Sequence, residues 1–448
     1  MIGQENEQII AGSIIDSVHC QSDHNQSYAL FLPTHYDDRL DWPVIYFFEP
    51  AARGTLPLIH FMEAAENYGY ILVASNNARN GSWKLVFDAA HAMFQDVGKR
   101  FSLDSARIYT SGFSGGARAA LAIAEKYDHI SGVLACGAGL PNPLEYQPTP
   151  KSSYSYLGIV GDKDMNFMEL HKVKGLLDSM QIRNRLLTFE GGHQWPPPET
   201  ANEAIEWLEL RSINHGAKLP NSIRSYFDKR IEEARGLKKE GALYLASKSY
   251  DQLIQDFEGL QNIGIAKEEL MLLVKDKAFK KDAKQHEKLF LKEDMLIERY
   301  LQAFKGISIG DIQDTIHFRN TEWWNNESRY LQRLSSSKIK ANQLIGKRMI
   351  DLIWRRCVET GNSYYAKGDY VRAIMIDEAW VQIHPNKRYP HYRLARSYAR
   401  VGSVETALQQ LQQAIEYGLK DFDLLKGEVA FQSLHDHEVF RNLLNKLR

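Results

Sequence analysis

The sequence predicts an α/β domain with a mostly parallel sheet, followed by a region made only of helices. In the first 216 residues, short apolar runs typical of buried strands alternate with stretches of helical spacing. This alternation favours crossover connections and therefore a parallel sheet. From about residue 220 the chain is charged and nearly free of strand signals, and its last part contains an internal repeat. Such repeats indicate stacked pairs of helices.

Each element is expected from a local pattern. Continuous apolar runs predict buried strands, Gly and Asn mark turns, and apolar residues three or four positions apart predict helices. The strands are expected at 9–18, 27–32, 43–48, 70–75, 107–111, 132–136, 154–160 and 185–189, with a turn at 23–25. The helices are expected at 61–68, 84–101, 117–126, 167–180, 199–213, 229–239 and 272–298.

The composition sets limits on the class of protein. The 448 residues exceed one core and indicate two or three domains. Lys and Arg (55) nearly balance Asp and Glu (56), so no overall field favours nucleic acid, and no apolar stretch is long enough for a membrane span. The three cysteines match no metal or redox spacing. No signal peptide is expected, which fits a cytoplasmic protein, or an exported one whose signal was trimmed.

The segment Gly112–Gly116 has the sequence Gly-Phe-Ser-Gly-Gly and lies between an expected strand and an expected helix. In that context the pattern G-x-S-x-G forms a sharp turn that presents a nucleophilic serine, here Ser114. The helix after it directs amide groups and a positive dipole end toward the place where an oxyanion forms. A second match, at 306–310, has no strand before it, and we expect it to be a turn.

A serine needs a histidine to take its proton and a carboxylate to orient that histidine. Downstream of Ser114, two strands end in suitable loops. The strand at 154–160 is followed by Asp162 and Asp164, and the strand at 185–189 by Gly191-Gly192-His193. His193 is the expected base and Asp164 the expected acid; Asp162 in the same loop is the alternative, as an acid or as a turn cap.

These segments, together with Trp195-Pro196 after His193, resemble the α/β-hydrolases, and within them the esterases related to feruloyl esterases and polyhydroxyalkanoate depolymerases. The resemblance covers about residues 5–215. It implies Ser114 as nucleophile, His193 as base and Asp164 as acid. It also implies a small-molecule, glycan or polymer ester as substrate, with no metal and no organic cofactor.

The loop that is expected to supply the second oxyanion donor departs from the family pattern. One oxyanion donor is expected at the Gly115 amide, and the other in the loop after the strand at 43–48. The family usually has His-Gly there, whereas this chain has Glu49-Pro50-Ala51. Because proline has no N–H, we place the second donor at Ala51. Glu49 is expected to pair with Arg53 or with Arg118.

The next strand-end loop carries Asn76, Asn77, Arg79 and Asn80, which lie toward the same mouth of the sheet. Contact of these four side chains with substrate hydroxyls or a carboxylate is one interpretation, and a plain polar turn is the other. Trp195 is expected either to line the substrate pocket or to pack beneath His193.

The internal repeat lies in the last hundred residues. It consists of a set of small residues and a tyrosine that recurs 34 positions later (for example, 395 minus 361): Gly361, Tyr364, Gly368 and Ala373 recur as Ala395, Tyr398, Gly402 and Ala407. This period resembles the tetratricopeptide repeat, which implies a protein partner or self-association. A looser copy begins at Gly241.

The sequence therefore predicts a catalytic domain at 1–216, a helical linker with partial repeats at 217–345 and tetratricopeptide-like repeats at 346–448. The expected function is that of a serine esterase that works through an acyl-enzyme. A non-catalytic binding module, in which the helical repeats act, and a serine peptidase are the alternatives.

Overall fold

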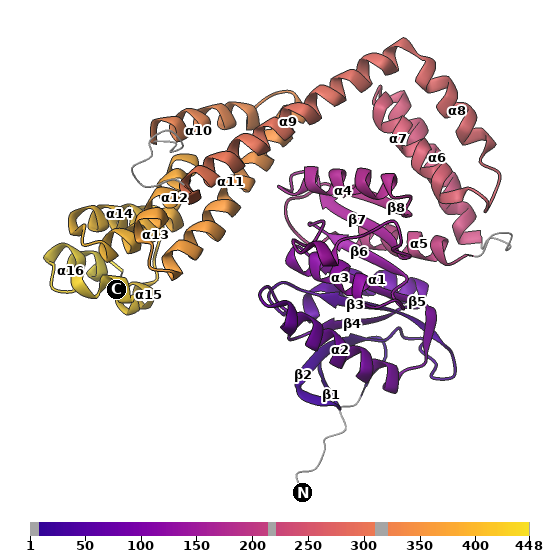
Figure 1. The fold of residues 1–448 in the computed structure, drawn as a ribbon, viewed down its shortest axis with the longest axis horizontal. Helices are drawn as coiled ribbons and strands as arrows, with labels where there is room; N and C mark the ends of the chain where they lie inside the picture. Colours follow the sequence, from indigo (N-terminus) through magenta and orange to yellow (C-terminus); the bar gives the residue numbers. More distant parts are fainter. Residues whose placement is uncertain (1–8, 214–220, 310–320, 448) are drawn as a thin grey trace, which may run out of the picture. The chain divides into compact units, whose positions relative to one another are not determined.

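The structure, a computed structural model, describes residues 9–213, 221–309 and 321–447. The chain divides into two compact units, Met1–Lys288 and Leu289–Arg448, whose elements are labelled in Figure 1. Among the described residues, no helix has both the length and the apolar character that crossing a membrane requires.

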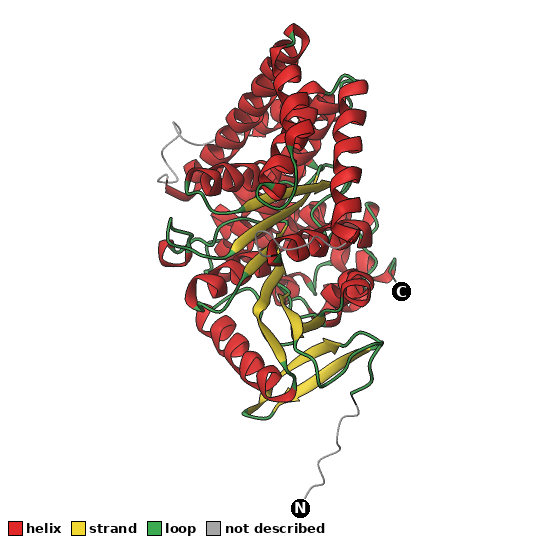
Figure 2. Ribbon diagram, turned by 90° about the vertical axis from the view of Figure 1, so that its right-hand side faces the viewer, coloured by secondary structure: helices red, strands yellow, loops and turns green. Residues whose placement is uncertain are grey.

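The first unit is built on one eight-stranded sheet with the order β1-β2-β4-β3-β5-β6-β7-β8. Strands β1 and β2 pair antiparallel with each other, β2 pairs antiparallel with β4, and all other neighbours are parallel. Figure 2 displays the sheet in yellow. The strands are β1 (Ile14–Cys20), β2 (Asp23–Phe31), β3 (Trp42–Phe48), β4 (Ile71–Ser75), β5 (Leu103–Phe113), β6 (Gly132–Cys136), β7 (Ser155–Gly161) and β8 (Asn184–Phe189).

Helices cover both faces of this sheet. On one face α1 (Thr55–Tyr68) and α5 (Pro198–Ser212) bury side chains against the strands. On the other face lie α2 (Trp83–Arg100), α3 (Gly115–Lys126) and α4 (Phe167–Ser179), whose apolar faces share a second core with the strands. A short 3₁₀ turn, η1 (Leu144–Tyr146), follows β6. The predicted fold class is confirmed in its layout: an α/β domain with a mostly parallel sheet is followed by helices.

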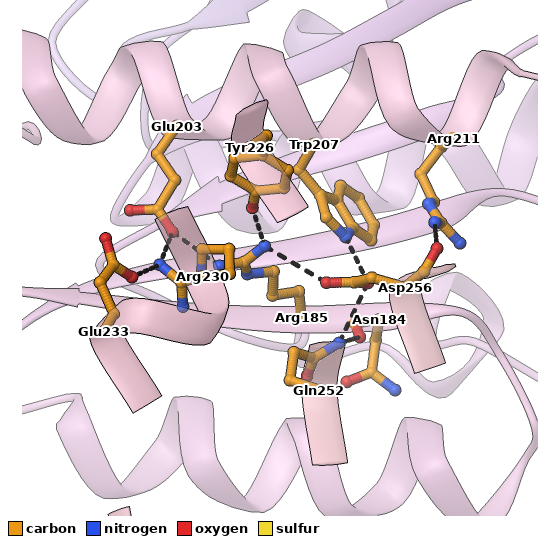
Figure 3. Close-up of polar contacts among 10 residues, drawn as sticks. All are labelled: Asn184, Arg185, Glu203, Trp207, Arg211, Tyr226, Arg230, Glu233, Gln252 and Asp256. Atoms are coloured by element: carbon orange, nitrogen blue, oxygen red, sulfur yellow. Dashed lines mark hydrogen bonds and ion pairs between the residues drawn. The ribbon is translucent and has the colours of Figure 1, made fainter. Parts of the chain in front are cut away.

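Three further helices belong to the first unit. They are α6 (Asn221–Lys239), α7 (Leu243–Phe257) and α8 (Gly264–Lys275), and they share an apolar core with Leu210 of α5. A buried polar cluster also joins α6 and α7 to the sheet, as Figure 3 shows. Arg185 of β8 bonds to Tyr226 of α6 and to Asp256 of α7. The helices that directly follow residue 216 are therefore packed onto the α/β layers.

Helix α9 (Lys277–Ile309) begins in the first unit and ends in the second, which contains helices only among its described residues. These are α10 (Thr321–Ser335), α11 (Lys340–Ala366), α12 (Tyr370–Ile383), α13 (Arg388–Arg400), α14 (Val404–Glu416), α15 (Phe422–Gly427) and α16 (Glu438–Asn445), with a 3₁₀ turn η2 (Val429–Leu434). The repeat glycines Gly368 and Gly402 lie between α11 and α12 and between α13 and α14, with φ of 78° and 79°. Equivalent turns thus recur at the repeat period; the tetratricopeptide likeness itself stays a prediction.

A buried ion pair lies inside this helical unit. Asp377 of α12 faces Arg393 of α13, with an Oδ1–Nη2 distance of 3.0 Å and side chains that are 2% and 4% exposed. Burial raises the pKa of the Asp377 carboxyl to about 7, because the loss of hydration outweighs the attraction of Arg393. The charged form of Asp377 is therefore unfavourable in the folded protein.

Some predicted elements differ from the structure. The turn expected at 23–25 lies inside β2, and the chain reverses at residues 21–22 instead. The single helix expected at 272–298 is interrupted at Asp276, between α8 and α9. Of the second G-x-S-x-G match, residues 306–309 belong to helix α9 rather than to a turn, and Gly310 lies outside the described residues. The domain boundaries near 216 and 345 stay predictions.

Candidate active site

Ser114 lies at the turn between β5 and α3, with φ 55° and ψ −118°. Such a left-handed backbone conformation is strained for a residue with a side chain. The neighbouring glycines are needed for close packing: a Cβ on Gly112 would overlap the Gly116 carbonyl, and a Cβ on Gly116 would overlap the Phe48 carbonyl. The Ser114 amide donates to the Cys136 carbonyl of β6 over 2.8 Å. Strand, turn and helix thus hold the serine in one place.

The structure brings Ser114, His193 and Asp164 together. His193 Nε2 lies 3.0 Å from Ser114 Oγ, and His193 Nδ1 lies 2.9 Å from Asp164 Oδ2. Ser114 is 4% exposed, the Asp164 side chain is fully buried, and the His193 side chain is 14% exposed. The imidazole thus bridges a hydroxyl and a carboxylate in the arrangement that activates a serine for attack.

Two backbone features fix the carboxylate. Asp164 Oδ1 accepts from the Asn166 amide over 2.8 Å, and the Asp164 amide donates to the Gly161 carbonyl. Asp162, the alternative acid, bonds elsewhere, because its carboxylate accepts from the Gly191 amide over 3.1 Å. Asp162 therefore ties the loop after β7 to the loop that carries His193, whereas Asp164 contacts the histidine.

Aromatic rings pack next to the imidazole of His193. Phe113 lies against His193 with ring centroids 4.6 Å apart, and Trp195 lies against Phe113 at 5.6 Å. Trp195 is 4% exposed and packs within the core on the α1 side of the sheet. Phe113 thus contacts both Trp195 and His193, and which of the two expected roles Trp195 has stays a prediction. His60 of α1 stacks on Trp195, and burial lowers the pKa of this histidine.

Most polar contacts in the loop after β3 are made by Glu49, whose side chain is fully buried. Its carboxylate Oε2 accepts from the Ala51 amide over 2.7 Å and from the Arg53 amide over 3.2 Å, and Oε1 pairs with the Arg53 guanidinium. Its backbone carbonyl accepts from the Ala52 amide. The Ala51 amide, expected as an oxyanion donor, is thus already bonded. Arg118 pairs with Glu169 over 2.6 Å, not with Glu49.

A cavity of about 270 Å³ opens beside the serine turn. Its lining includes the residue after the nucleophile, the loop after β3 and the loop after β4, contributed by Gly115, Pro50, Arg79, Asn80 and Asn142 among others. Of the expected substrate contacts, Arg79 therefore faces this cavity.

Asn76 and Asn77 lie elsewhere. The Asn76 side chain donates to the Asp16 carbonyl over 2.9 Å, and the Asn77 side chain accepts from the Ser27 amide and donates to the Asn25 carbonyl. Their short polar side chains fasten β1 and β2 to the end of β4, because the antiparallel strands leave backbone groups there to be satisfied. The sequence alone offered no signal that separates these two asparagines from Asn80 in the same loop.

Cys136 at the end of β6 lies close to the serine turn but is unsuited to nucleophilic chemistry. Complete burial raises the pKa of its thiol far above the usual range, so this cysteine stays protonated. Within the described residues, no cluster of three or more His, Cys, Asp or Glu side chains is arranged to hold a metal ion.

No protein-family model and no curated protein matches the chain. Solved structures that resemble it include an S-formylglutathione hydrolase of Staphylococcus aureus (12% identity, TM-score 0.38, 45% of this chain and 99% of the other). Others are the fluorophosphonate-binding serine hydrolase F of the same organism (13%, TM-score 0.37, 44% and 98%) and an esterase of Pyrobaculum calidifontis (12%, TM-score 0.36, 46% and 87%). Likeness this low does not identify an activity or a substrate for this chain.

Proposed function

We propose that the protein is a serine esterase that cleaves a carboxylic ester through an acyl-enzyme. The observation that carries the proposal is the geometry of three side chains. The Ser114 hydroxyl, the His193 imidazole and the Asp164 carboxylate form a continuous chain of contacts of 3.0 and 2.9 Å. Ser114 also occupies a strained turn at the start of a helix. A turn that only connects a strand to a helix has no need of such a conformation or of a buried imidazole–carboxylate pair.

The proposed reaction has two halves. Ser114 Oγ attacks the ester carbonyl carbon while His193 Nε2 takes the hydroxyl proton and Asp164 stabilises the imidazolium. The tetrahedral intermediate then collapses, and the alkoxide leaves as alcohol with the proton from His193. In the second half, water gives a proton to His193 and its oxygen attacks the acyl carbon. Collapse releases the carboxylic acid, and the proton returns to Ser114 Oγ.

The substrate is proposed to be a small-molecule ester, or an ester group on a glycan or polymer, whose one side enters the cavity beside Gly115. The charged side chains that line this cavity are Glu49, Arg118 and Arg79, and the first two are paired within the protein, with Arg53 and Glu169 respectively. Arg79 is exposed. An anionic group on the substrate would find its counter-charge there.

Covalent labelling tests the nucleophile. A fluorophosphonate probe should label the wild-type protein and the Ser179→Ala control, which lacks an exposed serine of α4, and should not label Ser114→Ala. Peptide mapping of the adduct should place it at residue 114. Hydrolysis of p-nitrophenyl acetate should fall to the buffer rate in Ser114→Ala and in His193→Ala.

Two outcomes would favour the alternatives. A wild-type protein that reacts with neither probe nor ester would favour a non-catalytic binding module. Cleavage of aminoacyl p-nitroanilides without cleavage of p-nitrophenyl esters would favour a serine peptidase, because the same three groups serve acyl transfer from amides.

For the helical unit we propose a role in binding a protein partner or a second copy of the chain. The support is the recurrence of Gly368 as Gly402 in equivalent turns. Light scattering during size-exclusion chromatography distinguishes the two: a mass near twice 51.4 kDa would indicate self-association.

A further inference from the structure

Within residues 50–53, the loop after β3 has no free backbone N–H group. Pro50 lacks an N–H, and the next three amides are all bonded to Glu49: Ala51 and Arg53 to its carboxylate, Ala52 to its carbonyl. Hydrolysis of an ester needs donors aimed at the oxygen that becomes negative, and one amide from the turn itself, Gly115, supplies only part of that stabilisation. A donor from another element would supply the rest.

Asn80 is a polar side chain that lines the cavity and packs against Gly115. A Cβ added to Gly115 would overlap Asn80 Oδ1 and would lie 2.7 Å from Asn80 Cγ and 3.1 Å from its Nδ2. The carboxamide therefore packs against Gly115, with its oxygen as the nearest atom. Asn80 lines the cavity beside the serine turn together with Gly115 and Gly116. A carboxamide packed against the residue that follows the nucleophile is within reach of an oxyanion bound at the Gly115 amide.

Backbone contacts fix the position of the Asn80 main chain. Its amide donates to the Pro50 carbonyl over 3.0 Å, and its neighbour Arg79 forms a bridge with Ala51. Gly81 follows with φ 145°, a conformation that favours glycine. Among the described residues no hydrogen bond holds the Asn80 carboxamide itself, so a half-turn of its terminal bond presents either the oxygen or the NH₂ group.

We propose that the Asn80 side-chain NH₂ is the second oxyanion donor of the site, in place of a backbone amide from the loop after β3. This inference rests on the proposed esterase function and adds a catalytic residue to it. Glu49 then acts as the positioning residue that binds the loop amides and holds Pro50 where it can fix Asn80.

The test compares Asn80→Ala and Asn80→Asp with wild type, using p-nitrophenyl acetate. Loss of one oxyanion donor typically lowers kcat by about 100- to 1,000-fold. We expect that loss in both variants, with KM changed by less than about threefold, because the donor acts on the transition state and not on the bound ester. The rate of fluorophosphonate labelling should fall in parallel, since the phosphonyl oxygen occupies the same place.

Asn67→Ala is the matched control: it removes an exposed asparagine of α1 and should leave kcat unchanged. Thermal unfolding identifies variants that fold, and Asn80→Asp keeps the shape of the side chain if the alanine variant is unstable. A kcat within threefold of wild type in a folded Asn80 variant would overturn this inference alone and would leave the oxyanion to the helix amides of Gly115 and Gly116. A wild-type protein without esterase activity would overturn the proposed function as well.

Discussion

The buried polar cluster between β8 and the helices α6 and α7 allows a quantitative prediction. Arg185 is 2% exposed at its side chain and pairs with Asp256, which is 5% exposed, over 3.2 Å. Asp256 also accepts from Trp207 of α5 over 2.9 Å. Glu203, the other carboxylate bonded to Arg185, is 24% exposed. The substitution Asp256→Asn keeps the shape of the side chain but removes its charge (Figure 3).

The loss of stability depends on the Arg185 charge, which stays buried after the substitution. Breaking a buried ion pair by neutralising one partner typically costs about 3–5 kcal/mol, because the remaining charge is left without full compensation. Glu203 still contacts Arg185, so we expect the lower end, about 3 kcal/mol. At roughly 2–4 °C per kcal/mol for a unit of this size class, the melting temperature of the first unit should fall by about 6–12 °C.

Scanning calorimetry, combined with the near-ultraviolet circular dichroism of the buried Trp207, would measure the shift. Glu233→Gln is the matched control, because Glu233 pairs with Arg230 at the edge of the same cluster and is 40% exposed. An exposed pair of this kind is worth about 0–1 kcal/mol. If Asp256→Asn melts within about 2 °C of wild type while the control behaves as expected, Arg185 is not held by this carboxylate and the reasoning fails.

Four further predictions follow from other parts of the chain. Ala52 has φ 61°, so Ala52→Gly should raise the free energy of unfolding by roughly 0.5–1 kcal/mol in denaturant titrations, and a loss of stability would contradict the strain. Arg79→Gln should lower kcat/KM for p-nitrophenyl hemisuccinate by about five- to tenfold and leave p-nitrophenyl valerate unchanged; equal losses would show that the charge is not used. Because the pKa of Asp377 is raised from 3.8 to about 7, its contribution to stability is fully present below pH 3.8 and is lost as the pH rises to about 7. In urea titrations, the free energy of unfolding of the wild type should therefore fall more between pH 5 and pH 8 than that of Asp377→Asn. An equal change in both proteins would refute the assignment. Finally, the fragment 1–216 should be unstable and the fragment 1–288 should fold, as judged by circular dichroism, because only the longer one retains α6 and α7, which supply Tyr226 and Asp256 to the buried Arg185.

The parts of the fold that local pattern determines could be predicted from the sequence. Continuous apolar runs located the strands within a few residues, since strands buried on both faces leave little choice of residue type. Ser114, Asp164 and His193 were located because each follows a strand, and parallel strands deliver their ends to one edge of the sheet. The structure brings these three side chains into contact.

The parts that depend on contacts between distant or competing groups could not be predicted. Nothing in the sequence indicates that the Glu49 carboxylate accepts from the Ala51 amide, because the sequence leaves both Arg53 and Arg118 as partners for Glu49. The position of Asn80 over Gly115 joins residues 35 positions apart (115 minus 80) and depends on how two loops meet. Arg185 was placed in a strand by its apolar neighbours, but two of its partners, Tyr226 and Asp256, lie on helices beyond residue 220.

The Glu49 loop has a consequence for how the protein receives its ligand. The hydrogen bonds described above for Glu49 all lie within five residues, from 49 to 53. The loop is therefore ordered by its own side chain, and its conformational entropy is lost during folding rather than when a molecule binds. Hydrogen exchange at these amides should be equally slow with and without a bound phosphonate, as expected for a rigid rim and not for a closing flap.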